Sequence, residues 1–242
     1  MRPLTVPELL NVWERGVGAR PFERALEILT AAAPETSATA LACVSIGRRD
    51  ARLLRLREWA FGSDLPIVAA CPRCHQPLET TLTVGDLCAP PEAGGDPDTT
   101  LTTGEYKIRC RPPNSEDLAA CVGLDAATSR RTLLLRCVME ASCGDNAVKA
   151  DELPDWVLEA VVQRIAEADQ AEIRINLTCP DCEHRWNEVF DIVSFFWTEI
   201  DAWARRLLRE VHVLASAYGW SEREILGLSP VRRQIYLAMA EQ

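Results

Sequence analysis

The sequence has few of the residues on which most enzymes depend. It contains only three histidines among 242 residues, and it has neither a glycine-rich phosphate-binding loop nor the nucleophile elbow of a hydrolase. Without these elements, no set of acids, bases and nucleophiles can be assembled from the sequence. We therefore expect a protein that is not an enzyme, with no catalytic residues and no small-molecule substrate.

Positive charge is also scarce. The chain has 26 basic and 36 acidic residues, a net charge of −10, which argues against non-specific binding to nucleic acid or to an anionic membrane. No apolar run approaches the ~20 residues of a membrane helix, and residues 1–8 lack the features of a secretory signal. We expect a cytoplasmic protein with no nucleic-acid or membrane partner.

Ten cysteines are too few in a chain of this length for a disulfide framework, and their spacing suits a reducing compartment. Six of them are scattered, and such cysteines usually act as small buried hydrophobes. A second metal site built from Cys110, Cys137 and Cys143 is disfavoured, because none of their spacings is diagnostic. The sequence assigns no role to the six scattered cysteines: Cys43, Cys88, Cys110, Cys121, Cys137 and Cys143.

The other four cysteines form two matching motifs, CPRC at 71–74 and CPDC at 179–182, with 104 residues between them. Two thiolates separated by two residues can bind one metal ion from a single tight turn. Two such turns complete a tetrahedral four-sulfur shell with no open position, which is typical of structural Zn²⁺. The predicted metal ligands are therefore Cys71, Cys74, Cys179 and Cys182.

The flanks of the two motifs also match. The first motif follows the apolar run 65–70 and the second follows the segment IRINL at 173–177, and each precedes an alternating segment, at 78–84 and 186–192. This pattern predicts strand, knuckle and strand in each copy. A thioredoxin-type redox motif would instead open a helix, and metal-free reduced thiols remain the other alternative. His75 and His184 lie beside the knuckles, but four sulfurs already fill the shell.

The fold class that we predict is α+β and mainly helical, built on a split four-cysteine zinc ribbon of two β-knuckle hairpins. Helical periodicity predicts helices near 6–14, 21–32, after Gly47, from Glu116, at 128–141 and at 151–167. Prolines and glycines predict a linker at 88–100, and alternation predicts a strand at 99–111. Gly219 is expected to end the long C-terminal helix, and Ser221 with Glu224 to form the capping box of the next helix. The predicted domains are an N-terminal helical region at 1–64, the split ribbon at 65–88 and 172–193, a linker, strand and helical insertion at 89–171, and a long helix with two short helices at 194–242.

The predicted helix after Gly47 carries a series of arginines among its leucines. We favour a solvated helix face as its explanation. The alternative is a docking edge for an acidic partner or for the acidic middle of the same chain. The series consists of Arg48, Arg49, Arg52, Arg55 and Arg57.

The C-terminal segment is the most recognisable part of the chain. The stretches AYGWSEREIL at 217–226 and LSPVRRQIYL at 228–237 resemble the ending of small proteins of contractile phage tails and related contractile injection systems. The family they resemble is the T4-like baseplate protein family, which covers hub components and hub-assembly chaperones. The two knuckles and the stretch GRRDARLLRLRE at 47–58 resemble larger versions from contractile injection systems.

This resemblance implies a role in protein–protein interactions during baseplate or tail assembly, as a structural component or as an assembly chaperone. The protein can accordingly be incorporated into an assembled particle. Its expected partners are other tail, baseplate or injection-system proteins. The smaller family members lack the zinc unit, so a more specific role does not carry over. On this view the apolar anchors of a partner-binding segment are flanked by arginines. The candidate partner-binding residues are Trp220, Glu224, Ile225, Leu226, Arg232, Arg233, Tyr236 and Leu237.

Two alternatives concern this C-terminal segment. Its apolar residues can simply pack against the long helix that precedes them. Its helices also superficially resemble a helix–turn–helix, so a zinc-ribbon nucleic-acid-binding or transcription-type adaptor is the alternative function. Glutamates surround its arginines, whereas phosphate contacts need a basic face.

Overall fold

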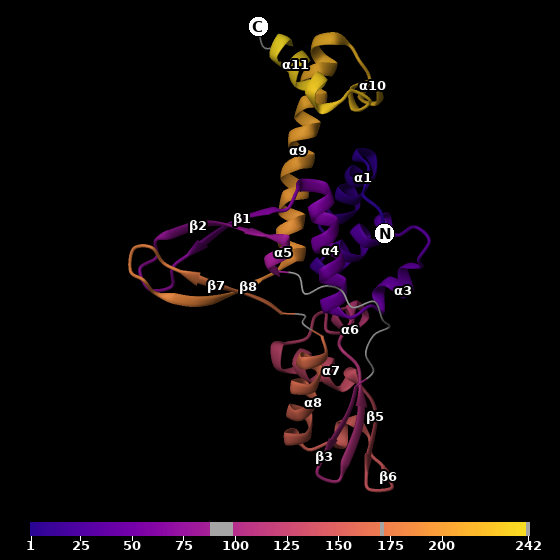
Figure 1. Ribbon diagram of the computed structural model, residues 1–242. Helices are drawn as coiled ribbons and strands as arrows, with labels where there is room; N and C mark the ends of the chain where they lie inside the picture. Colours follow the sequence, from indigo (N-terminus) through magenta and orange to yellow (C-terminus); the bar gives the residue numbers. More distant parts are fainter. Residues whose placement is uncertain (88–98, 170–171, 241–242) are drawn as a thin grey trace.

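The structure is a computed structural model that describes residues 1–87, 99–169 and 172–240. It has four parts, which are visible in Figure 1: a helical body, two β-hairpins that project from one side of it, an insertion at one end and a small helical head at the other. We use these four names below. The described part of the chain has an α+β fold that is mainly helical, as predicted.

The body consists of helices packed against the first half of the long helix α9. Its buried residues include Ile28, Leu53, Phe196 and Ile200, each fully shielded from solvent. Pro7 and Pro21 lie in the first turns of two of these helices, where a missing N–H costs nothing. The helices are α1 (Val6–Gly16), α2 (Pro21–Ala32), α3 (Ala38–Ala42), α4 (Ile46–Phe61) and α9 (Ile192–Tyr218).

The ends of α9 are set by local chemistry. The Asp191 carboxylate accepts hydrogen bonds from the N–H groups of Val193 and Ser194 at its start, and Gly219 ends it with φ of 70°, as predicted. An apolar stripe runs along the whole helix from Ile192 to Leu214. Near its start, Trp197 packs so closely over Gly16 that a Cβ atom there would lie 2.2 Å from the indole ring.

The two hairpins are separate two-stranded antiparallel sheets. Leu65, Ile175 and Leu177 are buried in the same core as the body helices, so the base of each hairpin is part of the body. Their elements are β1 (Asp64–Ala70), β2 (Pro77–Thr83) and the short helix α5 (Val84–Leu87) for the first, and β7 (Ile173–Thr178) and β8 (Arg185–Phe190) for the second.

The insertion differs from the helical unit that the sequence predicts, because its core includes a four-stranded antiparallel sheet. The expected single strand at 99–111 is a hairpin that turns at Gly104, where φ is 58°. The expected helix at 128–141 ends at Cys137, and residues 138–143 pair with the second strand of that hairpin. Pairing with a distant strand therefore overrides the local helical pattern.

The sheet of the insertion packs against α8, with Ile108, Val157 and Val161 in its core. The predicted linker at 88–100 lies mostly outside the described residues, and its last two residues begin β3. The elements are β3 (Thr99–Thr103), β4 (Tyr106–Cys110), α6 (Ser115–Ala120), α7 (Ala126–Cys137), β5 (Val138–Cys143), β6 (Asn146–Ala147), the 3₁₀ turn η1 (Ala150–Glu152) and α8 (Asp155–Ala168).

A group of polar side chains holds the insertion together around Asp117, whose side chain is fully buried. Its carboxylate accepts hydrogen bonds from Arg111 at 2.6 and 3.0 Å, from Arg136 at 2.8 Å and from the N–H group of Asn114 at 3.0 Å. Burial opposes ionisation of this carboxyl, but these donors outweigh it and lower its pKa.

The start of α4 joins the body to the insertion. The Ser45 hydroxyl and the Gly47 N–H group donate to the Asp169 carboxylate at 3.2 and 2.9 Å. The Arg49 guanidinium reaches the Ser115 hydroxyl at 3.4 Å. A carboxylate is stabilised beside the first N–H groups of a helix, so Asp169 fixes the insertion against α4.

The arginine series of α4 is only partly a solvated face, which corrects the favoured prediction. Arg55 is exposed, but Arg49 and Arg57 are 4% and 1% exposed. Arg57 donates to the Glu199 carboxylate at 2.8 and 2.6 Å and to the Gly62 carbonyl oxygen at 2.8 Å. Arg57 therefore joins α4 to α9, and Arg49 contacts the middle of the chain, as the alternative explanation held.

The head is formed by α10 (Glu222–Leu226) and α11 (Pro230–Ala240), which fold back on the last turns of α9. Figure 1 shows it beyond the body, at the end of α9 opposite the insertion. Ser221 and Glu224 form the predicted capping box of α10. Val211, Leu214 and Ile225 are its buried apolar residues.

Replacing Arg57 by alanine should lower the free energy of unfolding by about 3 kcal/mol, because the change leaves Glu199 without its partner and opens space between two helices. Replacing Arg55, whose side chain is 57% exposed, should change it by less than about 0.5 kcal/mol. Urea unfolding of the two variants measures both quantities. Equal losses would contradict the role given to Arg57.

Asp117→Asn should destabilise the protein at neutral pH by on the order of 1–3 kcal/mol, because it removes the charge that three donors share. The folded-state pKa of Asp117 is lowered, whereas the unfolded-state value is about 3.9. Its stabilising contribution is therefore present above that pH and is lost as the pH falls through the folded-state pKa. The stability difference between wild type and variant should shrink in acid. A difference that stays constant would contradict this assignment.

Candidate metal centre

The first knuckle is a tight turn between β1 and β2. The Cys71 N–H group donates to the Gln76 carbonyl oxygen at 3.0 Å, and the His75 N–H group donates to the Cys71 carbonyl oxygen at 2.9 Å. His75 has φ of 61°, a left-handed conformation that lets the chain reverse directly after Cys74. Both sulfurs of this motif therefore point to one side of the turn, as the CPRC spacing predicts.

The second knuckle repeats this geometry between β7 and β8. The Cys179 N–H group donates to the His184 carbonyl oxygen at 2.9 Å, and the Glu183 N–H group donates to the Cys179 carbonyl oxygen at 3.0 Å. Glu183 has φ of 56° and takes the place that His75 has in the first turn. The two motifs are therefore two copies of one local structure.

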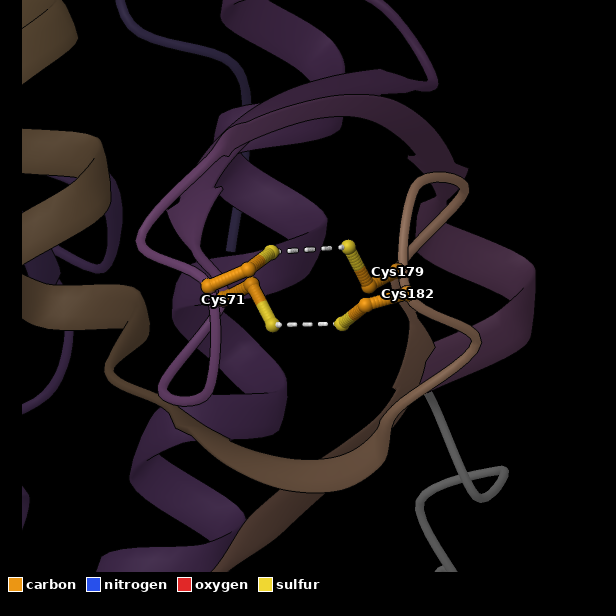
Figure 2. Close-up of side chains that lie close together, drawn as sticks. Cys71, Cys179 and Cys182 are labelled. Carbon is orange, nitrogen blue, oxygen red and sulfur yellow. Dashed lines mark hydrogen bonds between the residues drawn. The ribbon is translucent and has the colours of Figure 1, made fainter.

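The two knuckles face each other and bring their sulfur atoms together. The Sγ atoms of Cys71 and Cys182 are 3.7 Å apart, and those of Cys74 and Cys179 are 3.5 Å apart. Figure 2 shows these two contacts as dashed lines between the hairpins. All four Sγ atoms lie within 4.8 Å of one another. The structure therefore assembles the four predicted metal ligands at one point.

The spacing of the sulfurs suits a tetrahedral metal ion. With Zn–S bonds of about 2.3 Å, tetrahedral geometry puts neighbouring sulfurs about 3.8 Å apart, close to the distances found here. Cys71 and Cys179 are buried, and Cys74 and Cys182 are half-buried. These four cysteines could therefore bind a metal ion with all four positions filled by sulfur.

The thiols of this cluster differ in their tendency to ionise. Burial opposes ionisation of Cys71, but the N–H groups of Cys74 and Arg73 and the neighbouring thiols outweigh it and lower its pKa to about 7. An N–H group at Gln76 favours ionisation of Cys74, whereas burial and the other three thiols raise its pKa to about 12. A bound metal cation would favour the thiolate form of all four cysteines, because its positive charge stabilises the thiolates that bind it.

The two histidines beside the knuckles lie outside the sulfur cluster. His75 is exposed, and His184 stacks on Trp186 with 6.1 Å between ring centres. Within the described residues, the four-cysteine cluster is the one group of potential metal ligands. Cys110 and Cys137 are buried, and with Cys143 they do not form a second cluster in that part of the chain. Cys88 lies outside the described residues.

The candidate partner-binding residues divide into internal and surface positions. Ile225 is fully buried, and Arg233 is 6% exposed, with hydrogen bonds to Glu210 at 3.3 Å and to the Leu228 carbonyl oxygen at 2.9 Å. Leu226, Tyr236 and Leu237 are half-buried in the head. These five side chains pack within the head. This is the alternative in which the apolar residues of the segment pack against the preceding long helix.

Three of the candidates are closer to the surface. Arg232 and Glu224 are exposed, although Glu224 accepts hydrogen bonds from the N–H and hydroxyl groups of Ser221. Trp220 is half-buried and stacks on Tyr218 with 4.7 Å between ring centres. Of the two candidate arginines, Arg232 is therefore the one that is accessible to a partner.

The head has an exposed apolar surface that the sequence pattern did not reveal. Val231, Ile235 and Met239 of α11 are 69%, 50% and 58% exposed. Their spacing of four residues puts them on one side of a helix, and this spacing was the sequence signal for that surface. It was hidden because Tyr236 and Leu237 in the same helix are equally apolar and pack inward.

No helix in the described part of the chain is long and apolar enough to cross a membrane. Comparison with curated proteins and with solved structures gave no match. A family model does match, that of the T4 bacteriophage base plate protein, over residues 23–197. The match covers most of the body, both hairpins and the insertion, and it ends before the C-terminal segment that carried the sequence resemblance.

This match covers well over half of the chain, and it includes both knuckles and all four cysteines of the cluster. It supports a role in the structure or assembly of a phage baseplate, and interaction with other baseplate or tail proteins. The chain belongs to the T4 bacteriophage base plate protein family.

Proposed function

We propose that this protein is a non-catalytic, zinc-stabilised interaction protein of baseplate or tail assembly in a contractile phage tail or injection system. It acts as a structural component or as an assembly chaperone. The observation that supports this proposal most strongly is the four-sulfur cluster, which joins hairpins from distant parts of a chain in a baseplate family.

Zinc is the metal that the ligand set favours. Four thiolates at tetrahedral spacing suit Zn²⁺, and a shell of four sulfurs has no position for water or substrate. Such an ion stabilises a fold and does not activate a reactant. The proposed role of the metal is therefore structural, which agrees with the lack of catalytic motifs in the sequence.

The need for the ion follows from the weakness of the hairpins. Each is a two-stranded sheet, and their strands pair only within each hairpin. An isolated two-stranded hairpin is marginal in water, and the knuckle ends project from the body (Figure 1). Metal binding that occurs only in the folded state adds its free energy to stability.

The head is the proposed contact surface for other tail or baseplate proteins. It projects from the body on α9, and Arg232 and Trp220 lie at or near its surface. Arginine and tryptophan are enriched among the residues that dominate protein interfaces. A nucleic-acid function is less favoured, because Arg233 pairs with Glu210 and the chain is strongly acidic.

Protein purified under reducing conditions should contain one zinc ion per chain. Cys74→Ser should remove most of this zinc, because three thiolates and a hydroxyl hold the ion far more weakly. It should also lower the melting temperature. Cys43→Ser is the matched control, since Cys43 is exposed and outside the cluster. Elemental analysis and thermal unfolding measure these effects. Equal zinc content in both variants would contradict the proposed site.

Arg232→Glu should reduce capture of co-expressed tail and baseplate proteins by about tenfold or more, the range of an interface residue that costs over 1 kcal/mol, with no change in melting temperature. Arg233→Ala is the contrasting variant, because Arg233 is buried and paired with Glu210. It should lower the stability of the head. Pull-down with quantitative mass spectrometry measures capture. Unchanged capture by Arg232→Glu would argue against a contact at this position.

A further inference from the structure

The insertion has an open apolar groove that the described residues of the chain do not fill. A cavity of about 590 Å³ lies between α7 and α8. Leu133, Leu134 and Cys137 line it from α7, and Val162, Ile165 and Ala166 line it from α8. Two helices side by side with apolar residues facing outward form the kind of groove that accepts a third helix.

The head has a matching unfilled feature. Val231, Ile235 and Met239 form a convex apolar stripe on the outer side of α11, and Ala238 lies beside it. The opposite side of the same helix packs on α9 through Arg233, Tyr236 and Leu237. The stripe has three exposed anchors at i, i+4 and i+8, which is how an amphipathic helix contacts a groove.

One molecule cannot bring these two surfaces together. In Figure 1 the groove-forming helices α7 and α8 lie at one end and α11 lies at the other. Between them runs α9, whose 27 residues span about 40 Å at 1.5 Å per residue. The stripe of one copy can therefore meet a groove only on another molecule.

Charge favours a second copy as that molecule. Residues 201–240, which form the end of α9 and the head, carry six arginines and four carboxylates. Residues 99–169, which form the insertion, carry eight basic and twelve acidic residues. Residues 201–240 are thus net positive and the insertion is net negative within one acidic chain, so attraction guides the C-terminal end of one copy to the insertion of the next.

We propose that α11 of one copy docks in the α7–α8 groove of a second copy. The two surfaces differ, so the contact is head-to-tail, and each added copy presents a new free surface. Such contacts build rings or open chains and do not stop at a dimer. The residues involved are distinct from Arg232, so this inference concerns a different contact from the one assigned to other tail proteins.

Two surface variants test this arrangement in the zinc-loaded full chain. Ile235→Glu adds an acidic group to the stripe, and Ala166→Arg adds a bulky cation to the groove. Both positions are exposed, so neither change disturbs a core. Val17→Glu is the matched control, because Val17 is an exposed apolar residue outside both surfaces. Analytical ultracentrifugation over micromolar to near-millimolar concentrations measures the mass.

The wild type and Val17→Glu should pass from single chains to species larger than a dimer as concentration rises. Each of the other two variants alone should remain at the 26.9 kDa chain mass. Their equimolar mixture retains one intact stripe and one intact groove, so it should reach twice the chain mass and stop there. This complementation is specific to a head-to-tail contact.

Several results would overturn the inference. Wild-type protein that remains monomeric at all concentrations would contradict docking between copies. This holds even if a helix of another protein or a small apolar molecule binds in the groove. A dimer that persists in either single variant, or a mixture that remains monomeric, would contradict it too. If this inference fails while Arg232→Glu still loses tail proteins and Cys74→Ser still loses zinc, the proposed function stands.

Discussion

The four-sulfur contact between the hairpins is the constraint on which the rest of the chain depends. It joins residues more than a hundred positions apart, and the strands of one hairpin do not pair with the strands of the other. Joining chain segments this far apart costs conformational entropy. The cost is offset at two places: at the hairpin bases, where Leu65 and Ile175 enter the body core, and at the knuckles, where the sulfurs meet.

This contact also determines where the insertion begins and ends. The insertion follows the first hairpin and precedes the second, so both of its ends lie near the body. The start of α4 then fixes its orientation through Asp169 and the Ser45–Asn114 bridge. The second hairpin leads directly into α9, since β8 ends at Phe190 and the helix begins at Ile192. A firm hairpin therefore gives α9, and the head that it carries, a fixed starting point.

Local chemistry explains why the sequence could predict the two CPxC turns, whose four cysteines cluster, and the helix boundaries at Gly219 and Ser221. Each CPxC motif determines its own turn, and Asp191, Gly219 and Ser221 act on the residues next to them. The family was also recognisable from the sequence, although its model matches residues 23–197 and not the C-terminal segment that carried the resemblance. Features that depend only on near neighbours can be read without the fold.

Features that depend on distant neighbours could not be predicted. Residues 138–143 become a strand because β4 lies beside them, and their own pattern favours helix. Arg57 appeared to be one of several solvated arginines, because its partner Glu199 is 142 positions away. The outward orientation of Val231 and Ile235 is likewise decided by which side of α11 faces α9. In each case the tertiary partner, and not the residue type, sets burial.

Two of the buried arginines have a common role that apolar residues would not fill. Arg57 joins α4 to α9 through Glu199, and Arg233 joins α11 to α9 through Glu210. Apolar stripes pack well at several rotations and registers, whereas a guanidinium–carboxylate contact has a narrower geometry, above all where it forms two hydrogen bonds, as Arg57 does with Glu199. Pairing each packing helix to α9 by one charged contact therefore selects a single arrangement among apolar alternatives. The four-cysteine cluster brings the two hairpins together in the same way, so α9 is held in one orientation relative to the elements around it.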